Sequence, residues 1–158
     1  MIELNKLTDF ELAITIRAVE EKFLELFECG ALNGTVHTCI GQELSAVSFC
    51  RQLYEDDYVF SNHRCHGHFI AFTKEYQSLI SELMGKISGV CGGVGGSQHL
   101  CNKNFFSNGP QGSLTPVALG AAKACKLLSN NKLAMCFIGD GTMGEGIVYE
   151  SMNMASLY

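Results

Sequence analysis

Hydrophobic positions near the start of the chain recur at helical spacing. Thr8 and Glu11 have the relation of a capping box, and the apolar residues that follow continue on one face until Gly30: Leu12, Ile16, Val19, Phe23, Leu26 and Phe27. Because residues three or four positions apart lie on the same side of a helix, this pattern predicts an amphipathic helix over about 9–28. A shorter helix is expected over about 41–53.

The middle of the chain alternates between short apolar runs and polar or glycine-rich connections. The β-prone run 58–60 leads into the polar string 61–68, and functional groups are expected at such a strand end. A further helix face is marked by Tyr76, Leu79, Ile80, Leu83 and Met84. The glycines that come next predict a loop that bends sharply or approaches another group closely: Gly85, Gly92, Gly93, Gly95 and Gly96.

The last third of the chain has the pattern of a strand between two helices. Thr115 and Pro116 predict the N-cap and first residue of a helix, in which small residues would permit close packing on a sheet: Gly120, Ala121 and Ala124. The apolar run 133–138 is typical of a parallel strand covered on both faces, and Gly139 opens a last helix. We therefore expect the turn 139–144 at the carboxyl end of a central parallel strand.

These elements predict a single α/β domain with a central parallel sheet flanked by helices. Within it, we expect residues 1–53 to form leading helices and residues 54–158 to form a partial α/β core. The 158 residues are 47% hydrophobic and 17% charged, which is enough apolar material for a folded core.

Charge and composition exclude some classes of binding partner. A net charge of −5 with 11 Lys and Arg provides no basic patch, so we expect no nucleic-acid partner. Apolar runs are too short to cross a membrane, and residues 1–6 lack a signal or transit pattern, so we expect no membrane partner and a bacterial cytoplasmic location, with an organelle matrix as the alternative. The eight cysteines lack CxxC spacing, and we expect reduced, mainly buried thiols.

The strongest local chemical signal is the segment 139–144 (GDGTMG), between a predicted strand and a predicted helix. Read as GxGxxG, its glycines would let a dinucleotide pyrophosphate approach the helix N-terminus. Asp140 would repel that diphosphate unless a cation stood between them, and Mg²⁺ removes the conflict by binding both groups. The magnesium interpretation is favoured, while a dinucleotide site and a plain tight turn stay open as alternatives.

Five segments, in the same order along the chain, resemble one known family. They are 37–43 (HTCIGQE), 64–67 (RCHG), 95–99 (GGSQH), 139–141 (GDG) and 149–155 (YESMNMA). From about Leu12 to Tyr158 the chain resembles the alpha subunits of the first component of thiamine-diphosphate-dependent 2-oxo acid dehydrogenases, of the pyruvate, branched-chain or acetoin type. The resemblance implies the thiamine-diphosphate-binding fold, with thiamine diphosphate and Mg²⁺ as cofactors.

The resemblance also implies how the diphosphate end of the cofactor is held. Asp140 would ligate Mg²⁺, and Gly139, Gly141 and Thr142 would lie against the diphosphate. Arg64 would donate to the same diphosphate, a role that suits a planar guanidinium that is always charged. Taken alone, Arg64 would more often be a solvated charge or an ion-pair partner.

Further residues are assigned to the other end of the cofactor. Gly109 and Gln111 match positions whose backbone groups meet the aminopyrimidine ring, although the segment before them is a residue shorter than in common members. His37 matches a histidine on the substrate side, where it would position or protonate a developing enolate-like group. His63 stands where the family commonly has a tyrosine beside the diphosphate-binding arginine, so the resemblance makes it a cofactor-binding residue at the diphosphate end. Alone, His37 would more often be an ordinary surface or core histidine.

The implied reaction is oxidative decarboxylation of a 2-oxo acid substrate, with transfer of the acyl group to a lipoyl-bearing acyltransferase. The implied partner is the beta subunit of the same dehydrogenase. The family supplies a second magnesium ligand further along than this sequence extends, so we expect the fold to be incomplete at the C-terminus and the isolated chain to be inactive. The alternative is a non-catalytic remnant or assembly module of the same family.

A rival interpretation comes from the segment 63–68 (HRCHGH). Its imidazoles and thiol suggest a zinc site, with His99 as a further ligand. The spacing fits no standard zinc motif, and Arg64 in the middle would oppose a cation. The thiamine-diphosphate interpretation is therefore preferred.

Overall fold

A four-stranded mixed sheet lies at the centre of the computed structural model, which describes residues 4–32 and 34–158. The strand order is β2-β3-β1-β4, with bounds Cys101–Asn102, Phe105–Ser107, Tyr58–Ser61 and Ala134–Cys136. β1 pairs in parallel with both β3 and β4, whereas β2 and β3 form an antiparallel hairpin. The predicted α/β class is confirmed.

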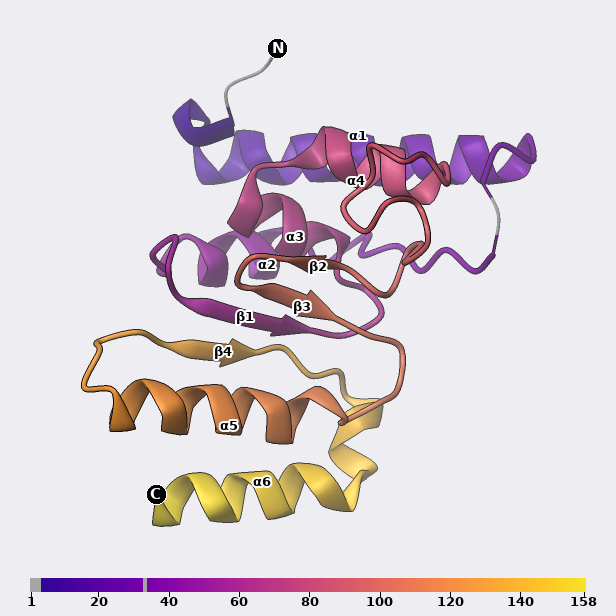
Figure 1. Cartoon of the computed structure of the whole chain (residues 1–158). Helices are drawn as coiled ribbons and strands as arrows, with labels where there is room; N and C mark the ends of the chain where they lie inside the picture. Colours follow the sequence, from indigo (N-terminus) through magenta and orange to yellow (C-terminus); the bar gives the residue numbers. More distant parts are fainter. Residues whose placement is uncertain (1–3, 33) are drawn as a thin grey trace.

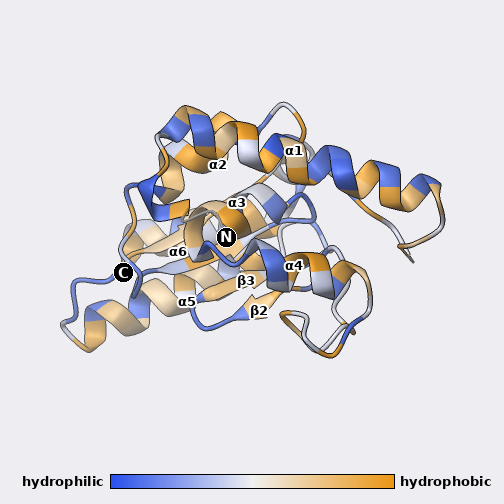
Figure 2. Cartoon of the chain, turned by 90° about the horizontal axis from the view of Figure 1, so that it is seen from above, coloured by the Kyte–Doolittle hydropathy of each residue, from blue (hydrophilic) through white to orange (hydrophobic). Residues whose placement is uncertain are grey.

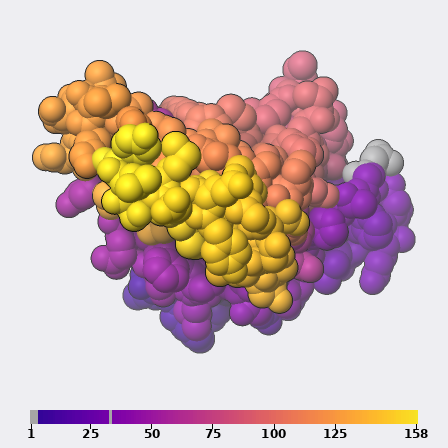
Figure 3. Space-filling view, turned by 90° about the horizontal axis from the view of Figure 1, so that it is seen from below, coloured from indigo at the N-terminus to yellow at the C-terminus, as the bar shows by residue number. Residues whose placement is uncertain are grey.

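Helices cover both faces of the sheet (Figure 1). On one side, α3 (His66–Thr73) lies against the strands with α2 (Glu43–Cys50) beside it, and α1 (Asp9–Glu28) and α4 (Tyr76–Leu83) lie further out. On the other side, α5 (Leu114–Leu127) covers β1 and β4, and α6 (Gly146–Leu157) packs on α5. Figure 3 shows α6 lying across the surface of this side.

The predicted first helix and its capping box are confirmed. The Thr8 hydroxyl accepts a hydrogen bond from the Glu11 N–H at 3.3 Å, and the Glu11 carboxylate accepts one from the Thr8 N–H at 2.8 Å. Such a box satisfies two backbone donors that a helix start leaves unpaired. Behind it, α1 buries Leu12, Ile16 and Phe23, which fixes the face that it turns to the protein.

The main core lies between the sheet and the helices of the first half of the chain. Phe23 of α1, Phe69 of α3 and Phe105 of β3 are almost fully buried, and the rings of Phe69 and Phe105 meet edge to face with centroids 5.2 Å apart. Burying one such side chain stabilises the fold by about 2 kcal/mol. The other side is thinner: α5 is apolar along much of its length (Figure 2), yet it buries only Ala118 and Cys125.

Two elements were not predicted by the sequence pattern. α3 begins inside the polar string 61–68 because its histidines have partners that allow them to be buried. The Nδ1 of His66 lies 3.0 Å from a Glu20 oxygen, and the Nδ1 of His68 lies 2.8 Å from the Ser61 hydroxyl. The hairpin of β2 and β3 is the other unpredicted element, and it is too short for a period of two to be visible.

The predicted start of α5 is wrong, and two of the three residues of its predicted packing face are exposed, whereas Ala121 is half-buried. The helix begins at Leu114, and the Thr115 hydroxyl donates to the Gly112 carbonyl at 2.6 Å instead of capping the helix as an acceptor. Gly120 and Ala124 are exposed, so they do not provide the close contact with the sheet. Alanines and glycines mark a helix face poorly because both faces tolerate them.

The prediction of a central strand before the glycine turn is also wrong for this chain. β4 is parallel to β1, as expected, but it stands last in the strand order of the sheet. Its three residues are half-buried, because no strand of the described residues lies along its outer edge. The turn at 139–144 still follows the carboxyl end of a parallel strand.

The prediction that the cysteines are mainly buried is confirmed only in part. All eight are free thiols, but only Cys39, Cys50, Cys65 and Cys125 are buried. Within the described residues, no helix combines the length and the apolar character that crossing a membrane requires.

A glycine pair provides a test of this packing. A Cβ added at Gly67 in α3 would stand 2.9 Å from the buried Cys39 sulfur and 3.3 Å from the Ala46 Cβ, whereas one added at Gly120 in α5 would meet nothing within 4 Å. Gly67→Ala should therefore lower the free energy of unfolding by about 1–2 kcal/mol through overpacking. Gly120→Ala should raise it by about 0.5–1 kcal/mol, because alanine favours a helix interior.

Urea unfolding of both variants measures these effects. If Gly67→Ala is as stable as Gly120→Ala, the close approach of α3 to the Cys39 segment is not present in solution.

Candidate functional site

The glycine turn lies where the carboxyl end of β4 meets the last two helical segments. The turn runs through the 3₁₀ helix η2 (Gly141–Gly144) and leads directly into α6. Asp140 is exposed at the start of η2, and its side chain makes no capping hydrogen bond. A Cβ at Gly141 would meet no atom within 4 Å, so the backbone faces open space there. Helix starts of this kind attract anions, because their backbone N–H groups point outward.

Four of the predicted site residues form a continuous line of contacts. The buried Thr142 hydroxyl donates to the Gln111 side-chain oxygen, and the Gln111 Nε2 lies 3.2 Å from the His63 Nδ1. The His63 ring meets the His37 ring edge to face, with centroids 5.1 Å apart. The fold thus connects segments that are far apart in the sequence, from His37 to the glycine turn.

Arg64 is tied to the same region through the His37 segment. Its guanidinium donates to the Thr38 carbonyl at 2.5 Å, and its backbone N–H donates to the Asn62 side chain at 2.8 Å. Partial burial lowers the pKa of the neighbouring His63, and the charges of His37 and Arg64 lower it further. Cationic and hydrogen-bonding groups therefore gather beside the line of contacts, an arrangement that suits an anionic ligand.

A small crevice of about 20 Å³ lies at the carboxyl ends of β1 and β4. Its walls include Ser61 at the end of β1 and Asn62 after it, Gln111 and Gly112, and Thr142 of the turn. Neither Arg64 nor Asp140, which are assigned to the same diphosphate, lines this crevice. Such a crevice has room for about one water molecule, and a cofactor would need a wider opening.

Gly109 and Gly139 are placed differently from each other. A Cβ at Gly109 would stand 2.5 Å from the Gln98 side-chain oxygen, so the backbone there lies closely against the segment 95–99. At Gly139 the nearest atom to an added Cβ is the Thr142 hydroxyl oxygen, at 4.0 Å. The first glycine is enclosed, whereas the second is open on the side of the turn.

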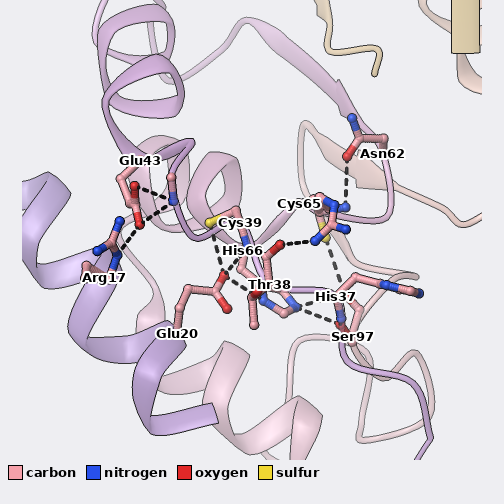
Figure 4. Close-up of polar contacts among 12 residues, drawn as sticks. Arg17, Glu20, His37, Thr38, Cys39, Glu43, Asn62, Cys65, His66 and Ser97 are labelled. Carbon is pink, nitrogen blue, oxygen red and sulfur yellow. Dashed lines mark hydrogen bonds and ion pairs between the residues drawn. The ribbon is translucent and has the colours of Figure 1, made fainter. Parts of the chain in front are cut away.

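A buried hydrogen-bonded network supports the His37 segment from beneath (Figure 4). One oxygen of Glu20 lies 3.0 Å from the His66 Nδ1, and it also accepts from the Cys39 N–H at 3.3 Å. The His66 Nε2 lies 2.9 Å from the Ser97 hydroxyl, and Glu20 and His66 are fully buried. In Figure 4 the His37 ring points away from this network. The network is a support for the segment, and the His37 ring stays accessible from the other side.

The glycine-rich loop after α4 is held by one carboxylate. Glu82 is 1% exposed, and its two oxygens accept hydrogen bonds from the backbone N–H groups of Cys91, Gly93, Gly95 and Gly96 at 2.7–3.1 Å. Burial alone would raise the pKa of Glu82, but the four N–H donors together hold it below its ordinary value. The loop, which ends at Ser97, is therefore a wall held by these four hydrogen bonds.

Sequence reasoning did not single out Glu20 or Glu82, and it named Ser97 only as part of the segment 95–99. Glu20 and Glu82 lie on the apolar faces of α1 and α4, where a carboxylate is expensive unless it has partners. The sequence did contain a signal for Glu82. This acidic residue lies in the predicted buried face of its helix, and a run of glycines whose N–H groups need acceptors follows it.

The described residues contain no group of three or more His, Cys, Asp or Glu side chains that could hold a metal ion. The histidines of the rival zinc interpretation have separate partners. His66 binds Glu20 and Ser97, while His68 binds Ser61 and stacks on Phe137 with ring centroids 3.8 Å apart. Asp140 is therefore not part of such a group within the described residues.

The fold is that of an α/β protein consistent with part of a thiamine-diphosphate-binding domain. The chain belongs to the family described as the dehydrogenase E1 component, whose model matches residues 11–158. The family is thiamine-diphosphate-dependent. The resemblance drawn from the five sequence segments is confirmed.

Curated relatives include alpha subunits of two kinds of oxidoreductase. The alpha subunit of acetoin:2,6-dichlorophenolindophenol oxidoreductase from Bacillus subtilis is 35% identical over 152 residues, covering 94% of this chain and 46% of the relative. The pyruvate dehydrogenase E1 alpha subunit of Rickettsia bellii is 36% identical over 154 residues, covering 94% and 47%. The human testis-specific mitochondrial form of that subunit is 33% identical over 152 residues, covering 94% and 39%. The chain spans less than half the length of these relatives.

Proposed function

We propose that this chain is the cofactor-binding part of the alpha subunit of a thiamine-diphosphate-dependent 2-oxo acid dehydrogenase. The observation that carries the proposal is the line of contacts from His37 through His63 and Gln111 to Thr142. It joins the residue assigned to the substrate side with the glycine turn assigned to the diphosphate. A plain structural turn would not require residues of four distant segments to meet there.

The residues present fit the diphosphate end of the cofactor in part. Asp140 is exposed and offers the hard oxygen ligand that Mg²⁺ prefers, next to the open backbone of Gly141. Asp140 would ligate the metal, Gly139, Gly141 and Thr142 would lie against the diphosphate, and Arg64 would add a charged donor. Since Mg²⁺ takes about six ligands, one carboxylate holds it only weakly without further groups.

At the other end, Gly109 and Gln111 would meet the aminopyrimidine, and His63 would hold Gln111 in place. His37, supported by Ser97 and directed away from the core, would position or protonate the reacting group of the substrate. The bound cofactor supplies the carbanion chemistry of decarboxylation, and the protein supplies orientation and electrostatics.

The proposed partners follow from the same assignment. We propose a beta subunit of the same dehydrogenase, a lipoyl-bearing acyltransferase and a 2-oxo acid substrate. The names of the relatives include both pyruvate dehydrogenase and an acetoin oxidoreductase, so pyruvate, branched-chain 2-oxo acids and acetoin are the substrates to compare.

A second candidate is a non-catalytic assembly module. An apolar cavity of about 240 Å³ opens between α5, β4 and α6, with Ala118, Ile138, Val148 and Met152 among its walls. Exposed apolar surface of this kind favours contact with another chain.

Reconstitution with a beta subunit, followed by an assay of the three substrates with thiamine diphosphate and Mg²⁺, tests both candidates. Turnover that falls at least about 100-fold in His37→Asn supports the enzyme. Complex formation without turnover in the wild-type chain supports the assembly module. The control variant is His99→Asn, which changes an exposed histidine outside the line of contacts.

A further inference from the structure

Two cysteines meet where the glycine-rich loop approaches the edge strand β2. Cys91 is half-buried in the loop, and Cys101 is exposed on β2. The Cys91 sulfur accepts a hydrogen bond from the Cys101 N–H at 3.2 Å, and its thiol donates to the His99 carbonyl at 3.4 Å. The sulfur of one cysteine therefore lies against the backbone of the other.

The position of the Cys91 sulfur is fixed by the surrounding loop. The Cys91 N–H donates to Glu82 at 2.7 Å, which anchors the backbone on one side. On the other side, Gly95 lies so close to β2 that an added Cβ would stand 2.2 Å from the His99 carbonyl oxygen. The Cys101 Cα is one bond of about 1.46 Å from the nitrogen that the Cys91 sulfur contacts, so the exposed Cys101 side chain starts close to the Cys91 sulfur.

We propose that Cys91 and Cys101 are a peroxide-reactive pair that forms a reversible disulfide, closing the glycine-rich loop onto β2. The loop carries Ser97, which contacts the His37 backbone N–H at 3.5 Å and the His66 ring. The disulfide would stiffen the wall that supports the His37 segment. This proposal does not depend on the proposed function.

The chemistry has a defined order. The exposed Cys101 thiol loses its proton, and the thiolate attacks one oxygen of hydrogen peroxide and becomes a sulfenic acid. The other oxygen leaves as hydroxide and takes up that proton to give one water. The Cys91 thiolate then attacks that sulfur and forms the disulfide, with the second oxygen leaving as water. Two thiols lose two electrons and two protons in total, and one peroxide is reduced to two waters.

Cys91 is suited to the second step by its fixed position beside Cys101, and burial makes it slower than Cys101 in the first. Burial raises the pKa of its thiol, and the nearby Glu82 charge opposes the thiolate. Peroxide therefore reacts first with the exposed Cys101, and the adjacent Cys91 acts as the resolving thiol. Fully buried cysteines differ: burial raises the pKa of Cys65 to about 12, which suppresses its reaction.

Peptide mass analysis of the peroxide-treated chain tests the pair directly. Trypsin cleaves after Lys86 and Lys103, so both sulfurs lie in one peptide, 87–103. In the native chain this peptide should lose two hydrogens and regain them with a thiol reductant. The disulfide should form about tenfold faster in the native chain than in the urea-unfolded chain, because the fold holds the sulfurs together.

Two single variants test the order of the steps. In Cys91→Ser, dimedone should label Cys101 as a trapped sulfenic acid, whereas in Cys101→Ser the label on Cys91 should be absent or much weaker. The control is Cys29→Ser, an exposed cysteine elsewhere, which should leave the disulfide yield unchanged. A peptide 87–103 that stays reduced, that is oxidised only to sulfinic acid, or that forms its disulfide no faster in the native chain than in urea would overturn the proposal.

Discussion

Glu82→Ala should lower the free energy of unfolding by about 4 kcal/mol, the largest loss that we expect from one side chain. The substitution removes the acceptor of four backbone N–H groups, from Cys91, Gly93, Gly95 and Gly96. A hydrogen bond to a charged group contributes about 1.5–3 kcal/mol, and the loop recovers part of the loss by binding water. Urea unfolding and hydrogen exchange of these amides measure the effect.

The matched control is Glu75→Ala, which removes an exposed carboxylate that contacts the Asn102 side chain. That variant should change the stability by less than about 1 kcal/mol. If Glu82→Ala behaves like the control, or if the amides of the loop exchange no faster than in the wild type, Glu82 does not organise the glycine-rich loop.

Acid should weaken the fold through His68. Burial lowers the pKa of His68 from 6.5 to about 4. Above pH 6.5, His68 is neutral in both the native and the unfolded chain, so its titration does not reduce the stability. As the pH falls from 6.5 to 4, His68 takes up a proton in the unfolded chain but stays mostly neutral in the native chain. The free energy of unfolding therefore falls by about 3 kcal/mol.

His68→Asn separates this effect from the titration of carboxylates. Asparagine keeps a polar group for the Ser61 hydroxyl but does not titrate. Between pH 7 and pH 4, the wild type should lose more unfolding free energy than His68→Asn does, by most of the amount attributed to His68. The control His99→Asn should lose as much unfolding free energy as the wild type. An equal pH dependence in wild type and His68→Asn would show that His68 binds its proton normally in the native state.

Strong hydrophobic periodicity predicted the helices better than the polar character of single residues did. α1 was predicted with its capping box because Thr8, Glu11 and six apolar positions all indicate one helix. α3 was missed because His66 and His68 read as polar, and only the tertiary partners Glu20 and Ser61 make them core residues. Local patterns contain no information about such distant partners.

The candidate site was predictable from ordered motifs, but its internal contacts were not. The motifs indicated His37, Arg64 and the turn at 139–144 as one site, without showing how they connect. The links are Gln111, between His63 and Thr142, and the Thr38 carbonyl, which accepts from Arg64. The edge position of β4 also lay beyond prediction, because an apolar run shows that a strand is covered but does not show its neighbours.

We propose that the turn at 139–144 holds a magnesium-bound diphosphate. Calorimetric titration with thiamine diphosphate, with and without Mg²⁺ and an added beta subunit, tests it most directly. We predict weak binding by the chain alone and tighter binding with the beta subunit. Binding should need Mg²⁺ in both cases, fall at least about 100-fold in Asp140→Asn and be unchanged in Asp56→Asn, an exposed acid near β1. Binding that is independent of Mg²⁺, or equally tight in Asp140→Asn, would contradict the claim.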